Sequence, residues 1–479
     1  MRKAMLQGLT SVLLLFALAA PAAAQTDRSA APKPGPAPTV RLPDILKRAL
    51  PNGLPVWIVE HHEVPVVQVD LIVRAGSAAD PAGKYGLASF TAALLDEGAG
   101  TRDALQIADA IDYLGAQLST GSSIDASSVR LHVSVARLAE ALPIMADVAL
   151  RPTFPPAEVD RIRDERLTDL QQARADPAEI IRWAFPLAVF GPQHRYGAAA
   201  VGTTGTLKTF TAEDLRAFHA ARFTPSQSVL LVVGDVKADA IWPLLERAFG
   251  GWKGAASSAS PPVPEPAQLR ARRVVIVDKP DAAQSQIRIG WVGVPRATPD
   301  YYALQVLNTI LGGSFTSRLN QNLREQHGYA YGAGSAFDMR RVSGAFFAAA
   351  GVQTDKTAES VKEFFNELTG ILRPIPADEI AKAKNYLALS YPRDFETTRD
   401  IAAQLATAFV YDLPEDFFST YVQKIQAVTP EEVQAAAKKS LNPDRFAVVI
   451  VGDRKTIEAP VRALNLGPIS YMKIEEAVR

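Results

Sequence analysis

The amino-acid sequence repeats one long pattern, and this repeat constrains the fold more than any other feature. The first copy contains three short sequence segments in order: Thr211-Ala-Glu-Asp-Leu, Phe223-Thr-Pro-Ser and Leu230-Leu-Val-Val-Gly-Asp235. The second copy follows 218 residues later: Thr429-Pro-Glu-Glu-Val, Leu441-Asn-Pro-Asp and Val448-Val-Ile-Val-Gly-Asp453. One offset that holds at three separated places indicates that a whole domain has been duplicated. We therefore expect two similar domains in tandem.

Hydrophobic periodicity predicts both strands and helices. Residues 128–135 alternate between apolar and polar side chains, which is typical of a strand with one exposed face. Apolar runs predict further strands at 54–59, 64–74 and 228–234. Helical spacing predicts helices at 104–114, 138–150, 156–175, 178–190 and 211–221, and the small-residue stretch 86–97 is predicted as another. The strand pairs at Val56–Val73 and Val274–Val292 match more loosely between the copies. The fold class is therefore α+β.

The N-terminus carries the marks of an export signal. A positive Met1-Arg2-Lys3 precedes a short apolar run at 9–20, and Pro21-Ala-Ala-Ala24 offers an A-x-A cleavage site. An uncleaved anchor is the alternative, but the run is short for a membrane span. We expect residues 1–24 to be a signal peptide cleaved after Ala24, which leaves a soluble protein, periplasmic or extracellular, with no membrane span.

Composition shifts divide the mature chain. Residues 25–39 are rich in Pro and Ala and are predicted as a flexible leader. Residues 250–268 lack periodicity and are rich in Gly, Ser and Pro, which predicts an interdomain linker. The two domains should therefore occupy 40–249 and 269–479.

Several classes of site are excluded by what the sequence lacks. There is no cysteine, so disulfides, thiolate metal sites and a cysteine nucleophile are impossible. Lys plus Arg total 51 and Asp plus Glu total 51, so global charge gives no sign of a nucleic-acid partner. No Gly-x-Ser-x-Gly elbow and no Walker A loop occur, and none of the six histidines forms an i, i+4 pair.

Several motifs together resemble the M16 (pitrilysin/insulinase) peptidase family, in its two-domain branch related to mitochondrial processing peptidase. They are Leu50-Pro-Asn-Gly-Leu, Gly83-Lys-Tyr-Gly-Leu-Ala, Leu311-Gly-Gly-Ser-Phe-Thr-Ser-Arg-Leu319 and Asn322-Leu-Arg-Glu-Gln-His-Gly-Tyr-Ala-Tyr331. With the repeat, the resemblance covers the chain from about Leu42 to its end. It implies two domains that each pack a mostly antiparallel sheet against helices.

The resemblance also implies where zinc should bind. Active members carry His-x-x-Glu-His in the helix after Gly-Leu-Ala, plus a distal Glu, so that the histidines hold Zn²⁺ and the internal Glu activates its water. Here those places hold Ser89, Ala92 and Ala93, and the distal position falls on Asp169. We therefore expect no zinc or other cofactor in this chain. Plain helix packing accounts for the small residues, and the space they leave should be a vacant, mostly apolar cleft.

Arg324 and Tyr331 match a second family motif. In active members, an Arg and a Tyr seven residues apart orient the substrate carbonyl and stabilise its oxyanion, so we expect the same roles here, opposite a partner's zinc. The structural alternative is an Arg paired with Glu325 and an aromatic residue in the core. The surrounding Leu-Arg-Glu-x-x-Gly context favours the functional interpretation.

The resemblance therefore implies a non-catalytic subunit of a heterodimeric periplasmic metallopeptidase. Its partner would be a homologous chain with an intact His-x-x-Glu-His, and its substrate an unfolded peptide that adds as a strand to a sheet edge. Ser119 and Thr120 replace the Asn-Ala that the family has at such an edge, which makes this edge less fit for substrate. The alternative is an inactive pseudo-peptidase that serves as a peptide-binding or scaffold module. An independent hydrolase would be a third possibility, but no motif supports one.

Overall fold

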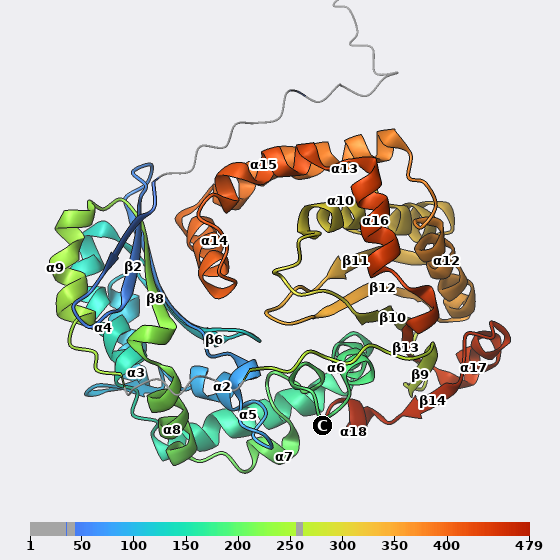
Figure 1. Cartoon of the computed structure of the whole chain (residues 1–479). Helices are drawn as coiled ribbons and strands as arrows, with labels where there is room; N and C mark the ends of the chain where they lie inside the picture. The colour runs from blue at the N-terminus through green and yellow to red at the C-terminus, as the bar shows by residue number, and fades with distance from the viewer. Residues whose placement is uncertain (1–34, 36–43, 255–261) are drawn as a thin grey trace, which may run out of the picture. The chain divides into compact units, whose positions relative to one another are not determined.

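The computed structural model describes residues 35, 44–254 and 262–479. Within these residues the strands form two six-stranded sheets and one short two-stranded sheet (Figure 1). The first sheet has the order β1 (Leu46–Ala49), β2 (Pro55–Glu60), β8 (Ser228–Gly234), β3 (Val66–Val73), β7 (Ser127–Ser134) and β6 (Gln117–Ser122). Only β2 and β8 pair in parallel there, so the sheet is mostly antiparallel.

The second sheet repeats this plan. Its order is β11 (Ala330–Phe337), β12 (Ala345–Gln353), β10 (Gln284–Val292), β13 (Ala447–Gly452), β9 (Arg273–Asp278) and β14 (Ile469–Met472). The strands β2, β3 and β7 begin 218 residues before β9, β10 and β12. The predicted duplication and the α+β class are therefore confirmed.

Helices surround both sheets. The first half contains α2 (Leu87–Ala92), α3 (Ala104–Tyr113), α4 (Leu138–Leu150), α5 (Pro156–Ala173), α6 (Pro177–Phe190), α7 (Thr204–Leu207), α8 (Ala212–Arg222) and α9 (Ala238–Phe249). The second half contains α10 (Tyr301–Leu311), α11 (Arg318–Asn320), α12 (Thr357–Gly370), α13 (Ala377–Ser390), α14 (Thr398–Val410), α15 (Phe417–Ala427), α16 (Pro430–Ser440), α17 (Arg454–Ala463) and α18 (Ile474–Ala477).

The helices α8 and α16 show the repeat at the level of single hydrogen bonds. Thr211 and Asp214 form a reciprocal capping box at the start of α8. Thr429 and Glu432 form the same box at the start of α16. The duplicated sequence therefore begins both helices by the same local interaction.

Two helices are exchanged between the halves. Helix α6, from the first half, packs against β10 and β13 of the second sheet, where Phe185 meets Phe347 edge-on. Helix α14, from the second half, packs against β3 and β8 of the first sheet. In Figure 1, α4 and α9 lie on one side of the first sheet and α14 on the other. Each sheet thus completes its core with a helix from the other half of the sequence.

One predicted helix is too long, and several other predictions concern residues that the structure does not describe. The helix predicted at 86–97 ends at Ala92, because the chain must reach Gly98 (φ +150°) and the short strand pair β4 (Gly98–Ala99) and β5 (Arg102–Asp103). The predicted signal peptide, nearly all of the leader and part of the linker (255–261) lie outside the described residues. The domain boundaries stay predictions. Among the described helices, none has both the length and the apolar character that crossing a bilayer requires.

Candidate functional site

Helix α2 and its C-cap residue Ala93 carry three of the four predicted metal positions, and the helix is held at its start by a buried carboxylate. Gly86 precedes the helix with φ +97°, a left-handed conformation that suits glycine. Both carboxylate oxygens of Asp80 accept hydrogen bonds, one from the Gly86 amide at 2.6 Å and one from the Ala88 amide at 2.7 Å. Burial raises the pKa of Asp80 to about 7, although these two amides favour its charged form.

The middle of α2 is held by a guanidinium. Arg166 of α5 donates from Nη1 to the Ser89 hydroxyl at 2.9 Å and from Nη2 to the Ser89 carbonyl at 3.1 Å. Its guanidinium also lies 5.7 Å from the ring centroid of Phe90. Burial lowers the pKa of Arg166, while the nearby charges of Asp169 and Glu165 oppose that shift. Sequence reasoning missed Arg166, because it belongs to no motif.

The residues at the metal positions do not fit zinc. Ser89 already binds a cation, Ala92 is 1% exposed, and neither alanine has a donor atom. Asp169 is exposed on α5, so one carboxylate remains where four functional side chains would be needed. Across 44–254 and 262–479, no three His, Asp or Glu side chains gather closely enough to hold a metal ion. No zinc-dependent step can be assigned to this chain.

Arg324 and Tyr331 lie side by side. Arg324 comes from a π-helical turn (Gln321–Gln326) that continues α11, and Tyr331 from the edge strand β11, near a register irregularity. The guanidinium of Arg324 lies 5.0 Å from the Tyr331 ring centroid and 4.7 Å from that of Phe315. An arginine thus lies between two aromatic rings, an arrangement that favours the cation electrostatically.

The exposure of this cluster separates the two interpretations of the motif. Tyr331 is 86% exposed and Phe315 is 60% exposed, so Tyr331 is no core aromatic. Arg324, whose side chain is 31% exposed, also forms the ion pair with Glu325 that the structural alternative foresaw, at 3.2 Å. The phenol therefore has no packing role, whereas the guanidinium has a structural partner and still faces solvent. Sequence reasoning missed Phe315, although it lies inside a quoted motif.

The loop that carries Phe315 is fixed against β11. A Cβ placed on Gly312 would lie 2.2 Å from the Ser335 amide nitrogen, so only glycine fits that approach. Asn320, 4% exposed, donates to the Phe315 carbonyl at 2.6 Å and accepts from the Ala333 amide at 3.2 Å. Asn320 therefore ties the loop to the strand that bears Tyr331.

Strand β6 is one edge of the first sheet, and Ser119 and Thr120 lie on it; the peptide-binding role of such an edge stays a prediction. The Thr120 hydroxyl donates to Asp96 at 3.3 Å. Burial raises the pKa of Asp96, and the nearby charge of Glu97 raises it further.

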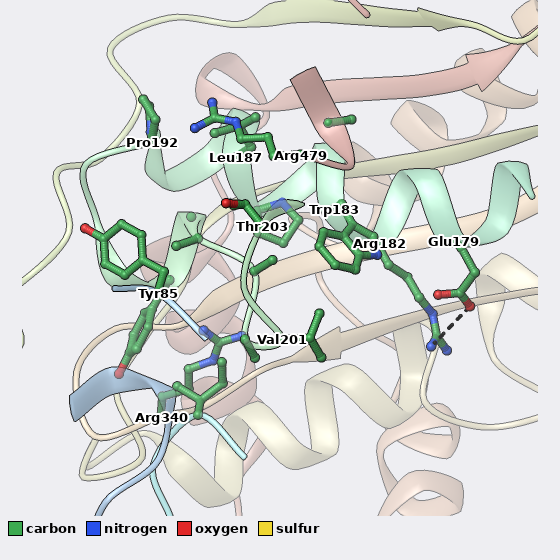
Figure 2. A pocket seen from close by; sticks show the side chains of 18 residues that line it. Tyr85, Glu179, Arg182, Trp183, Leu187, Pro192, Val201, Thr203, Arg340 and Arg479 are labelled. Atoms are coloured by element: carbon green, nitrogen blue, oxygen red, sulfur yellow. Dashed lines mark ion pairs between the residues drawn. The ribbon is translucent and has the colours of Figure 1, made fainter. Parts of the chain in front are cut away.

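Where a vacant apolar cleft was predicted, Ser89 instead contacts the guanidinium of Arg166. A cavity of about 320 Å³ does lie elsewhere, between α6 and the segment 196–203, and Figure 2 shows Trp183, Leu187 and Val201 around it. Arg182, paired with Glu179 at 3.6 Å, lies at the same cavity. None of the predicted site residues lines it.

Comparisons with known proteins agree with this architecture. A family model described as insulinase (peptidase family M16) matches residues 56–193, and one described as the peptidase M16 inactive domain matches 209–387. An uncharacterized zinc protease of Mycobacterium leprae is 29% identical over 431 residues, covering 88% of this chain and 95% of that protein. One of Bacillus subtilis is 23% identical and covers 84% and 96%.

Solved structures share the fold over most of the chain. The peptidase M16 inactive domain from Pseudomonas fluorescens has a TM-score of 0.80 at 27% identity, covering 85% of this chain and 98% of that one. A protease from Helicobacter pylori has a TM-score of 0.79 at 21% identity, with 86% and 100% covered, which shows a common fold. The two models belong to one family and together match residues in both halves of the chain. This chain belongs to peptidase family M16.

Proposed function

We propose that this chain is the non-catalytic subunit of a heterodimeric zinc metallopeptidase in the periplasm. Its partner is a homologous M16 chain that keeps His-x-x-Glu-His and binds the zinc. The substrate is an unfolded peptide. The sequence at 1–24 supports export, and the poor fit of Ser89, Ala92 and Ala93 to zinc supports the need for a partner.

The pairing of Arg324 with an exposed Tyr331 carries the proposal. A phenol that is 86% exposed gains little from packing, yet it lies 5.0 Å from a guanidinium on a sheet edge. Both groups donate hydrogen bonds to oxygen, and such donors stabilise the negative charge that develops on a carbonyl oxygen under attack. In the complex they act on the peptide bond that the partner's zinc site cleaves.

The test combines this chain with an exported M16 chain of similar size that keeps His-x-x-Glu-His. Cleavage of an unstructured fluorogenic peptide is measured for each chain alone and for the mixture, with zinc content and the dissociation constant of the pair. Only the mixture should cleave. Arg324→Ala should lower kcat by about 100-fold, as loss of one oxyanion donor does, and leave assembly unchanged.

Arg393→Ala is the matched control, because Arg393 is an exposed arginine of the same half outside this cluster. A mixture in which Arg324→Ala and Arg393→Ala cleave equally well would return Arg324 to a structural role beside Glu325. A complex that holds the peptide without cleaving it would instead favour the scaffold function.

A further inference from the structure

Arg166 is a largely buried cation with an unusual set of partners. Both of its hydrogen bonds go to neutral oxygens of a single residue, the hydroxyl and the carbonyl of Ser89. Asp169 and Glu165 act on it only through electrostatic attraction. Burial of a guanidinium without a hydrogen-bonded carboxylate is costly, so the contact must serve the local structure.

The position of Arg166 explains what the contact does. Ser89 is the third residue of α2, and its carbonyl oxygen also accepts the Ala93 amide at 3.1 Å, so Arg166 adds a bond from α5 to a turn that is already formed. Asp80 accepts from the amides at the start of the same helix. A helix of six residues is not stable alone, and here Asp80 holds its start while Arg166 ties its middle to α5.

We propose that Arg166 is a built-in cation that takes the place of the metal, joining α2 to α5 and keeping zinc out. The resemblance places metal ligands at Ser89 within α2, at Ala93 directly after that helix and at Asp169 on α5. A metal ion would link the helices through those ligands. Arg166, which lies on α5 and donates to α2, makes the link with its own side chain.

Arg166 would exclude zinc in two ways: by its positive charge and by pairing with the carboxylates that a metal would need. A fixed positive charge beside the ligand positions repels a divalent cation, most strongly where water is scarce. Carboxylates restored at positions 92 and 169 would pair with the guanidinium before they met a metal. The site should therefore stay closed to zinc even when its ligands are put back.

The experiment restores the ligands with Ser89→His, Ala92→Glu, Ala93→His and Asp169→Glu in the full chain, and compares this variant with and without Arg166→Met. Zinc per chain after dialysis and the zinc dissociation constant are measured, with Co²⁺ absorption to report tetrahedral coordination. We expect the chain that retains Arg166 to bind almost no zinc. Replacing Arg166 should give one zinc per chain and tighten binding by about 100-fold or more.

Arg182→Met in the restored chain is the control, since it removes one positive charge from an exposed helix position elsewhere. It should leave zinc binding at the level of the chain that retains Arg166. Equally tight zinc binding with and without Arg166→Met would overturn the proposal.

A second measurement tests the link between α2 and α5 without the restored metal ligands, so it also applies if the chains with restored ligands do not fold. In the otherwise unchanged protein, Arg166→Met should speed hydrogen exchange of the amides at 87–95 by about tenfold or more, and Arg166→Lys should do so less. Exchange in α12, which belongs to the other half, should not change. Unchanged exchange at 87–95 in Arg166→Met would refute the role of Arg166 in joining the helices.

Discussion

The side-chain amide of Asn320 donates to the carbonyl oxygen of Phe315 at 2.6 Å, and its oxygen accepts from the amide of Ala333. One buried side chain thus fixes both the loop that carries Phe315 and the strand that carries Tyr331. The geometry around Arg324 depends on this residue, although Asn320 itself lies beneath the surface.

Asn320→Ala should destabilise the chain. It leaves the Phe315 carbonyl and the Ala333 amide without their partner, which costs about 1–3 kcal/mol in free energy of unfolding for buried polar groups. Urea denaturation checks the value. Asn366→Ala is the control, because Asn366 is exposed and donates to Glu363 on the same helix face, and it should change the free energy by no more than about 0.5 kcal/mol.

Gly312→Ala should also destabilise the chain, because its methyl group would lie 2.2 Å from the Ser335 amide nitrogen. Relief of that clash requires the loop and β11 to separate, at a cost of about 1–3 kcal/mol. Gly370→Ala makes the same chemical change at the end of α12, where nothing lies within 4 Å. Thermal unfolding should show a lower Tm for Gly312→Ala alone, and equal Tm values for the two variants would contradict this account of the loop.

Asp70 should make stability depend on pH. It is 3% exposed on β3, and burial raises its pKa from 3.8 to about 6, against the opposing effects of Gln68, Arg130 and Arg399. Between these two values the folded state binds the proton more readily than the unfolded state, so the free energy of unfolding falls as pH rises from about 4 to 6. The full loss is about 3 kcal/mol.

Asp70→Asn isolates this contribution. The amide resembles the protonated acid and does not titrate, so the variant should lose less stability than the unchanged protein over the same range. His132 and Asp80 titrate in both proteins, so the difference between their urea-denaturation profiles reports Asp70. A difference that stays constant from pH 4 to 7 would show that Asp70 has an ordinary pKa.

Separated halves of the chain should not fold. The face of the first sheet that includes Ile72 and Val229 belongs to one buried cluster with Ile401 and Leu405 of α14. Residues 40–254 expressed alone would expose that face, and residues 262–479 alone would leave β13 without α6. We expect each piece to aggregate and a co-expressed pair to recover a soluble complex, as gel filtration would show. A monomeric, cooperatively unfolding first piece would contradict the importance of the exchange.

The sequence predicted local structure well where the signal was local. Strand β8 and helix α4 have the predicted bounds, because apolar patterning and short-range packing determine them. The capping box at Thr211 was predictable for the same reason. Arg324 and Tyr331 were found in the same way, because both belong to one short motif.

Contacts between distant residues were not predictable in this way. Arg166 meets Ser89 across 77 residues, and no periodicity indicates which of the arginines on α5 turns inward. Phe315 was visible inside its motif, but its place beside Arg324 depends on Asn320 and Gly312. The exchange of α6 and α14 could not be predicted from the sequence. An apolar helix face shows that a helix packs against a sheet, but it does not show which of the two sheets that is.

The exchanged helices bear on how such a chain could have arisen. A single ancestral repeat would have lacked the helix that completes its own sheet, so it could have folded only as a symmetric pair in which each copy lent that helix to the other. Fusion of two such genes would then have joined partners that were already interlocked, without creating a new interface. From that point the two sheets could diverge in chemistry, while the exchanged helices kept them a single folding unit.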